Sequence, residues 1–252
     1  MEKKWEEYNR WVENATADAD VVAELKTFDD AKIEDAFYRD LAFGTGGLRG
    51  VIGAGTNRMN VYTVARASQG LADYLKKQFE SPSVAIGYDS RIKSDVFAKV
   101  AAGVFAANRI VVHIWPELMP VPAVSFAVRY LHASAGVMIT ASHNQAKYNG
   151  YKVYGADGCQ ITTEAAAEIL TEIDKLDIFE DVENGKFEVW KQEKLKNAEN
   201  VENSENGDSE DGVKKGSIHY IRDEVYTAFI NEVKHQSVLF SEEVSKDVAI
   251  VY

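Results

Sequence analysis

Apolar side chains recur at helical spacing near the start of the chain. Trp5, Tyr8 and Trp11 are three positions apart, and charged residues lie between them. This period is typical of a helix with one buried face. Glycines in the segment 44–47 then end the pattern, because glycine is a poor helix former. We therefore expect two or three short helices over residues 1–40, forming an N-terminal helical extension.

Between residues 41 and 176, short apolar runs alternate with stretches of helical periodicity. The expected strands are 83–87, 110–114, 136–139 and 151–154, and the expected helices are 63–79, a helix capped by Ser94, a helix after Pro122 to about Leu131, and 163–176. This alternation predicts an α/β fold, a layered sheet flanked by helices. In such folds, ligands bind at the loops that follow the carboxyl ends of the strands.

The strand at 151–154 is expected to belong to a hairpin. The dipeptide Asn149-Gly150 predicts a turn before it, and residues 155–158 predict a second turn that leads into 159–161. Side chains alternate along a strand, so Lys152 and Tyr154 should share one face.

Beyond residue 196 the pattern changes. Residues 197–213 are polar, rich in Asn and acidic, which predicts a flexible linker. Ile218–Val233 is amphipathic and predicts a helix, and Val248–Tyr252 predicts a buried strand. We expect one domain over residues 41–196, a flexible acidic linker over 197–215, and the truncated start of a second, similar domain over 216–252.

The net charge of −12 is unevenly distributed along the 252 residues. Acidic residues gather in the segment 161–213, whereas basic residues outnumber acidic ones over 41–160. The middle of the chain is therefore positively charged and suited to an anionic ligand. Its lysines and arginines form no run interleaved with aromatic residues, so we expect no nucleic-acid partner.

Composition also bears on the compartment. No stretch approaches the roughly 20 consecutive apolar residues of a membrane helix, so we expect no membrane partner. The charged N-terminus shows no apolar segment typical of a signal peptide. The single cysteine, Cys159, cannot form an internal disulfide. Together these features predict a cytoplasmic location.

Four polar loops contain the candidate chemistry, at residues 43–50, 87–91, 140–144 and 149–152. The first is rich in glycine and carries Arg49, but it lacks the Gly-Lys-Ser/Thr of a phosphate-binding P-loop. The third contains adjacent Ser and His after a predicted strand, without the Gly-x-Ser-x-Gly elbow of a hydrolase.

In this order the four loops resemble those of the α-D-phosphohexomutases, the phosphoglucomutase and phosphomannomutase superfamily. The likeness runs from about Phe43 to Ile161, and FGTGGLRG at 43–50 is similar to the long branch with a helical N-terminal extension. The resemblance implies a phosphoserine enzyme that interconverts hexose 1-phosphate and hexose 6-phosphate, of glucose or mannose, through a bisphosphate intermediate. It implies an intramolecular phosphotransferase with a phosphosugar substrate and glucose 1,6-bisphosphate or mannose 1,6-bisphosphate as activator.

The resemblance also implies roles for particular residues. Ser142 matches the phosphoryl carrier, and Lys152 matches the lysine beside the reacting hydroxyl, a candidate general acid and base. Arg49 matches the arginine near the transferring phosphate, and His143 matches a histidine that positions substrate or phosphate. Mg²⁺ would bind an oxygen of phosphorylated Ser142 and three aspartates from a loop in the family's second domain.

Further contacts to substrate or phosphate are expected from Thr45, Asp89, Arg91 and Asn144. For Asp89 and Arg91, which match a supporting loop, the alternative is that they only brace that loop.

Two departures from the family pattern stand out. Gln145 replaces the usual proline after Ser-His-Asn, which should loosen the loop. No Asp-x-Asp-x-Asp sequence occurs in the 252 residues, so we expect an N-terminal fragment that is inactive alone. Phosphopentomutase or sugar-bisphosphate synthase activity remains an alternative, as does a non-catalytic phosphate- or partner-binding module. The sugar and the oligomeric state are left open.

Overall fold

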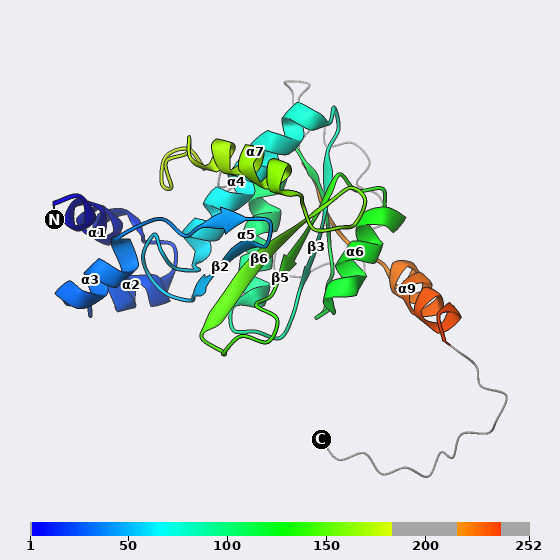
Figure 1. The fold of residues 1–252 in the computed structure, drawn as a ribbon, viewed down its shortest axis with the longest axis horizontal. Coiled ribbons are helices and arrows are strands. Elements are labelled where there is room, and N and C mark those ends of the chain that lie inside the picture. The colour runs from blue at the N-terminus through cyan, green and yellow to red at the C-terminus, as the bar shows by residue number, and fades with distance from the viewer. Residues whose placement is uncertain (1, 183–215, 238–252) are drawn as a thin grey trace, which may run out of the picture.

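A computed structural model describes residues 2–182 and 216–237, which form a mixed sheet with helices on both faces (Figure 1). The strands are β1 (Phe43–Gly44), β2 (Gly47–Val51), β3 (Ser83–Tyr88), β4 (Val111–Ile114), β5 (Ala135–Ile139), β6 (Tyr148–Gly155) and β7 (Ile218–Tyr220). Their order is β1-β2-β6-β5-β3-β4-β7. β5, β3, β4 and β7 run parallel, whereas β6 is antiparallel to both β5 and β2.

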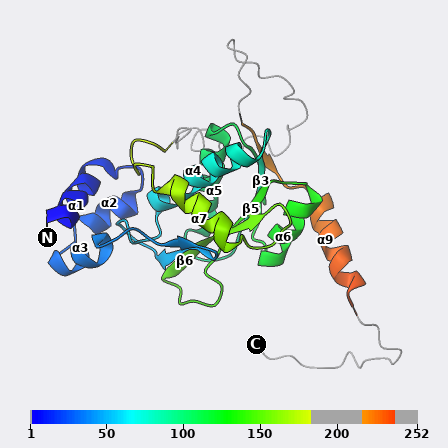
Figure 2. The same cartoon turned by 45° about the horizontal axis from the view of Figure 1, so that its top comes forward.

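Two helical layers cover the sheet (Figure 2). The layer on one face contains α4 (Val61–Gln78), α5 (Ser94–Ala107) and α7 (Thr163–Ile173), and the layer on the other contains α6 (Val121–Tyr130) and α9 (Asp223–His235). Each layer packs its apolar stripe on the sheet, and this burial is the main force that holds the layers together. The α/β fold predicted from the sequence is therefore confirmed.

Three short helices form the N-terminal extension, as the spacing of apolar residues predicts. They are α1 (Glu2–Asn14), α2 (Ala19–Leu25) and α3 (Asp30–Phe37). The carboxylates of Asp18 and Asp29 accept hydrogen bonds from the first turns of α2 and α3, which fixes where these helices begin. Trp11 is fully buried, with its ring 5.7 Å from that of Phe37 and 5.3 Å from that of Tyr62 on α4. The extension thus shares the core of the α/β body.

Three local predictions are wrong. Ser94 does not cap α5: Lys93 is the N-cap residue, and the Ser94 hydroxyl instead donates to Asp89. Asn149-Gly150 is no turn, because both residues lie inside β6. The helix predicted over Ile218–Val233 is a strand, β7, followed by α9, since the edge of β4 offers a partner that periodicity cannot reveal.

Other predictions are confirmed only in part or concern segments outside the described residues. The returning arm of the hairpin at 159–161 is reduced to one bridge between Tyr154 and Gln160. The linker at 197–213 and the strand at 248–252 lie outside the described residues. The domain boundary near residue 216 stays a prediction. In the described part of the chain, no helix is long and apolar enough to span a bilayer.

The pairing of β4 with β7 sets two histidines side by side. The ring centroids of His113 and His219 are 5.9 Å apart. Burial, together with the nearby His219, lowers the pKa of His113. The folded chain therefore favours a neutral His113.

We expect this pair to make the fold sensitive to mild acid. Below the ordinary histidine pKa of about 6.5, the unfolded chain binds a proton that folded His113 resists, so the free energy of unfolding falls as pH falls. The variant His113→Gln should lose less of its free energy of unfolding between about pH 7.5 and pH 5.5 than the wild type does, as measured by urea unfolding. His235→Gln, at an exposed site on α9, is the control. An unchanged loss in His113→Gln would contradict the assignment.

Candidate active site

The antiparallel strand β6 places two cations on one face of the sheet. Arg49 on β2 lies opposite Gly150 on β6, and Lys152 lies two residues further along β6. Paired residues share a face and side chains alternate, so Arg49 and Lys152 face the same side. Tyr151 points to the other side and is fully buried. Arg49 is exposed and Lys152 half-buried, so both can reach a ligand on this face.

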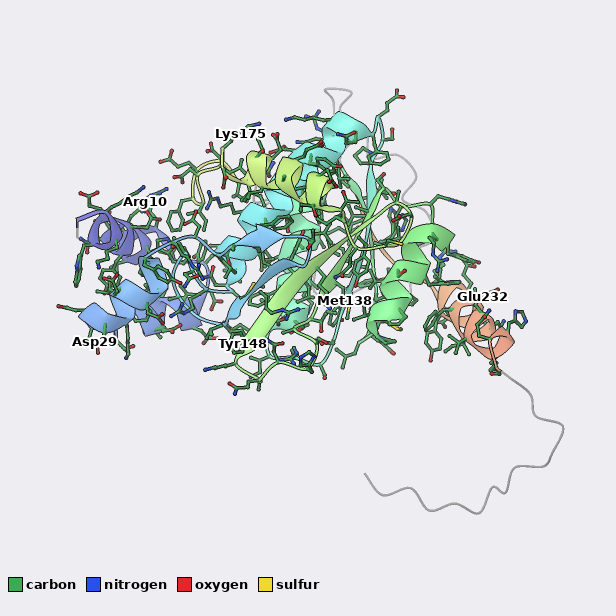
Figure 3. All side chains as sticks on the ribbon, in the orientation of Figure 1. Arg10, Asp29, Met138, Tyr148, Lys175 and Glu232 are labelled. Atoms are coloured by element: carbon green, nitrogen blue, oxygen red, sulfur yellow. The ribbon has the colours of Figure 1, made fainter. Side chains whose placement is uncertain are left out.

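Close packing of three strands at this point requires glycine. A Cβ at Gly150 would lie 2.7 Å from the carbonyl oxygen of Thr140 and 2.9 Å from that of Leu48. Thr140 continues the β5–β6 ladder, since its N–H donates to the Gly150 carbonyl over 3.0 Å. The loop with the candidate nucleophile therefore begins beside Arg49's strand partner. Figure 3 shows Tyr148 at the start of β6 and Met138 within the sheet, marking the two strands that frame the loop.

Ser142 has an unusual backbone conformation. Its φ is 56°, in the left-handed region that costs a non-glycine residue about 1–2 kcal/mol. Hydrogen bonds fix both of its peptide groups: its N–H donates to Thr140 Oγ1 over 2.9 Å, and its carbonyl accepts from Arg91 Nη2 over 2.6 Å. The side chain stays exposed, with Oγ 3.4 Å from Nδ1 of His143. A reactive hydroxyl is thus presented to solvent on a braced backbone.

Arg91 holds the serine loop through its backbone. The guanidinium donates hydrogen bonds to the carbonyl oxygens of Ser142, Asn144, Gln145 and Tyr148. The loop wraps around this planar fork, whose donors hold four of its carbonyl groups, while the effect of Gln145 on the rigidity of the loop stays a prediction. The bracing role is therefore visible for Arg91, whereas a contact to phosphate stays a prediction.

Asp89 completes the brace. One carboxylate oxygen accepts from Thr140 Oγ1 over 2.5 Å, and the other accepts from Ser94 Oγ over 3.0 Å and from the N–H of Arg91 over 3.1 Å. The Thr140 hydroxyl therefore links Asp89 to the amide of Ser142. Asp89, like Arg91, acts here on the loop, and its predicted contact to substrate or phosphate stays a prediction.

Sequence reasoning missed Asn149 as part of this network. It is fully buried on β6, and its Nδ2 donates to the carbonyl of Ile92 and to Ser94 Oγ, both over 3.0 Å. Its Oδ1 accepts from the N–H of Gly150 over 2.8 Å. A buried amide needs such partners. An Asn-Gly pair typical of a turn concealed the role, and no local signal could have found it.

The remaining predicted residues are less closely grouped. His143 and Asn144 lie on the serine loop, His143 exposed and Asn144 half-buried. Thr45 is exposed in the turn that joins β1 to β2, the strand that carries Arg49. In the sequence it is distant from the serine loop. Within residues 2–182 and 216–237, no three acidic, histidine or cysteine side chains lie close enough to hold a metal ion. These residues therefore do not form a Mg²⁺ shell by themselves.

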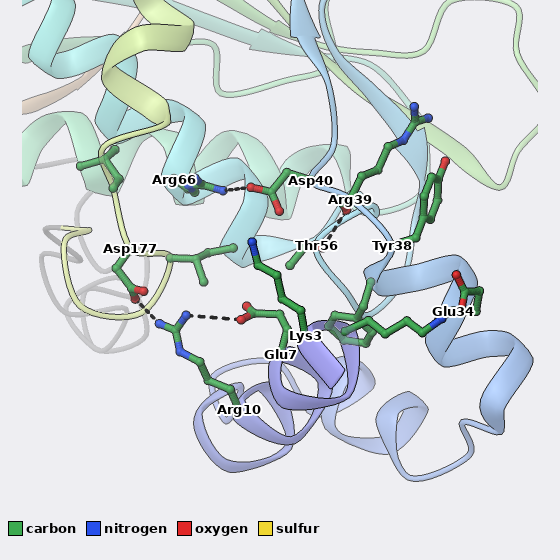
Figure 4. A pocket seen from close by; sticks show the side chains of 14 residues that line it. Lys3, Glu7, Arg10, Glu34, Tyr38, Arg39, Asp40, Thr56, Arg66 and Asp177 are labelled. Carbon is green, nitrogen blue, oxygen red and sulfur yellow. Dashed lines mark hydrogen bonds and ion pairs between the residues drawn. The ribbon is translucent and has the colours of Figure 1, made fainter. Parts of the chain in front are cut away.

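A cavity away from these residues lies between the helical extension and the α/β body (Figure 4). It has a volume of about 580 Å³ and contains paired charges: Arg10 contacts Glu7 and Asp177, and Arg66 bonds Asp40 over 2.6 Å. None of the predicted site residues lines this cavity, so its volume alone does not identify it as the active site.

Comparison with known proteins places this geometry in a family. The family model "Phosphoglucomutase/phosphomannomutase, alpha/beta/alpha domain I" matches residues 40–178. A phosphoglucomutase of Staphylococcus epidermidis is 49% identical over 143 residues, which cover 57% of this chain and 26% of the relative. A phosphoglucomutase of Staphylococcus aureus is 43% identical over 156 residues, 62% of this chain and 28% of the relative. The chain thus spans about a quarter of the length of these relatives.

Solved structures agree with this result. A protein of Thermus thermophilus, described as a phosphomannomutase, is 34% identical with a TM-score of 0.50, covering 54% of this chain and 30% of that one. A phosphoglucomutase/phosphomannomutase family protein of Burkholderia thailandensis is 15% identical with a TM-score of 0.51 over 77% of this chain and 35% of that one, and it supports the fold alone. With its sheet, its serine loop and a family model that matches more than half of its length, the chain belongs to the phosphoglucomutase/phosphomannomutase family.

Proposed function

We propose that Ser142 is the phosphoryl carrier of a phosphohexomutase that interconverts hexose 1-phosphate and hexose 6-phosphate, of glucose or mannose. The observation that carries this proposal is the exposed Ser142 hydroxyl on a strained, fully braced backbone. The relatives described above are phosphoglucomutases, but the chain spans only part of them, so the activity of the whole protein is part of the proposal.

The chemistry follows from the groups on the site face. Phosphorylated Ser142 transfers its phosphoryl group to a free hydroxyl of the hexose monophosphate, which gives a hexose bisphosphate. The bisphosphate reorients, and its other phosphate returns to Ser142. Phosphoryl transfer depends mostly on positioning and charge, so Arg49 would offset negative charge on the transferring group. Lys152, on the same face, would accept the proton of the attacking sugar hydroxyl, and the exposed Ser142 oxygen that leaves would take up a proton from solvent; on reversal both proton transfers run backwards.

Some components of the proposal lie beyond the described residues. A Mg²⁺ ion bound to an oxygen of phosphorylated Ser142 would need further ligands, because the described residues bring no three carboxylate, histidine or cysteine side chains together. Glucose 1,6-bisphosphate or mannose 1,6-bisphosphate would load Ser142 with phosphate before the first turnover. Because the sequence has no Asp-x-Asp-x-Asp segment, we expect no turnover from these 252 residues alone. Cytoplasmic location stays a prediction.

Ser142→Ala should abolish mutase turnover and incorporation of phosphate from glucose 1,6-bisphosphate, since the phosphoryl group then has no carrier. Intact mass and peptide mapping locate the phosphate, and coupled assays on the longest natural form of the protein give the rate. Ser90→Ala is the control and should keep both. A phosphate mapped to another residue would refute the proposal. Phosphate binding without transfer in the wild type would instead support a non-catalytic module.

Lys152→Ala should retain the phosphoserine but slow turnover by about 10²–10⁴-fold, the usual contribution of a general acid and base. The matched control is Lys77→Ala. Lys77 lies on α4, away from the site, and pairs with Glu172 on α7 over 2.7 Å. Rates with glucose, mannose and ribose 1-phosphates decide between hexose and pentose as substrate. Equal rates for Lys152→Ala and wild type would remove Lys152 from the mechanism.

A further inference from the structure

An ion pair joins the helical extension to the segment that braces the serine loop. Nζ of Lys93 lies 3.0 Å from Oδ2 of Asp18 and 2.8 Å from Oδ2 of Asp20. The Lys93 and Asp18 side chains are only 20% and 13% exposed. The Asp18 carboxylate is itself fixed, because it caps α2 by accepting from the N–H of Asp20. Lys93 is therefore held from the extension side in one position.

The backbone of Lys93 is left-handed, with φ 61° and ψ 10°. Glycine would adopt this conformation without strain, and asparagine would tolerate it better than lysine. Lysine also makes no side-chain capping bond to α5 at this position. Its side chain does not serve the helix it precedes, and the two carboxylates that its ammonium group contacts lie on the extension. The presence of lysine in this costly conformation is consistent with a role for its ion pair with Asp18 and Asp20.

The brace begins one residue after Lys93. Ser94 Oγ donates to Asp89 and accepts from the buried amide of Asn149. Asp89 in turn accepts from Thr140, whose hydroxyl holds the amide of Ser142. A continuous series of hydrogen bonds therefore runs from the Lys93 backbone segment to the nucleophile. Each partly buried polar group in this series depends on its partner, because an unpaired polar group in a low-dielectric environment is costly.

We propose that Lys93 is a positioning residue, through which Asp18 and Asp20 of the helical extension hold the serine loop in its braced form. The role of the loop in catalysis rests on the proposed function, but the mechanical link does not. Lys93 touches neither Ser142 nor the face with Arg49 and Lys152 in any contact described above. Its charge is already matched by two carboxylates, so it acts on the loop and not on the phosphate.

Hydrogen exchange on the 252-residue chain tests the link without any turnover. The variant Lys93→Asn suits the left-handed backbone but is too short to reach Asp18. We expect the amides of Ser142 and Asn144 to exchange about tenfold faster, the size expected for loss of one charge-assisted hydrogen bond. In Lys93→Arg the same two amides should exchange within about twofold of the wild-type rate, because the ion pair can re-form. Lys99→Asn, which breaks an exposed pair with Asp95 on α5, is the matched control and should change nothing in the loop.

A second variant approaches the pair from the other side. Asp18→Asn combined with Asp20→Asn keeps the cap of α2, since asparagine also caps helices, but removes both charges. It should loosen the same two amides as Lys93→Asn does. Faster exchange confined to α2, with the serine loop unchanged in both variants, would overturn the proposal. This second variant also decides the question if Lys93→Asn fails to fold.

A kinetic readout separates this proposal from the proposed function. In the longest natural form of the protein, Lys93→Asn should slow phosphoryl transfer from glucose 1,6-bisphosphate to Ser142, and Lys93→Arg should restore it. If wild-type Ser142 takes no phosphate, the proposed function fails, while the exchange result still decides the link. If loop exchange rises but the transfer rate is unchanged in Lys93→Asn, the positioning role in catalysis is refuted.

Discussion

The left-handed backbone of Ser142 is the constraint on which the site depends. Such a residue relaxes unless its surroundings hold it; here its N–H donates to the Thr140 hydroxyl and its carbonyl accepts from Arg91. Asp89 is the common partner of this arrangement, since it fixes the Thr140 hydroxyl and the Arg91 amide together. Relaxation of the loop would therefore require several bonds to break at once.

The sheet supplies the other half of the geometry. Because β6 is antiparallel to its two neighbours, one short stretch of it pairs with Arg49 on β2 and with the end of β5. Gly150 lets the three backbones approach, and Lys152 follows on the same face. The cations are placed by regular strands and the hydroxyl by a loop. This division gives fixed charge beside a presented nucleophile, as phosphoryl transfer requires.

Much of this could be predicted from the sequence. Helical and strand periodicity identifies the N-terminal helices and the strands of the body, because each buries one regular face. The bracing network could not be predicted, because its partners are far apart in the chain. Asn149 and Ser94 have local signatures of a turn and a cap, yet buried partners give both another role. β7 has only three residues, too few for any period to show, and only the edge of β4 defines it.

The late position of β7 has a consequence during synthesis. β4 is complete once Ile114 has been made, but its partner begins at Ile218. Throughout that interval, the outer N–H and C=O groups of β4 have no strand to pair with, although apolar residues lie on it. An unpaired edge of this kind can pair with another chain instead. The nascent protein thus exposes the unpaired edge of β4 until the segment containing His219 has been made, and during that interval β4 can pair with another growing chain; pairing with β7 then covers this edge.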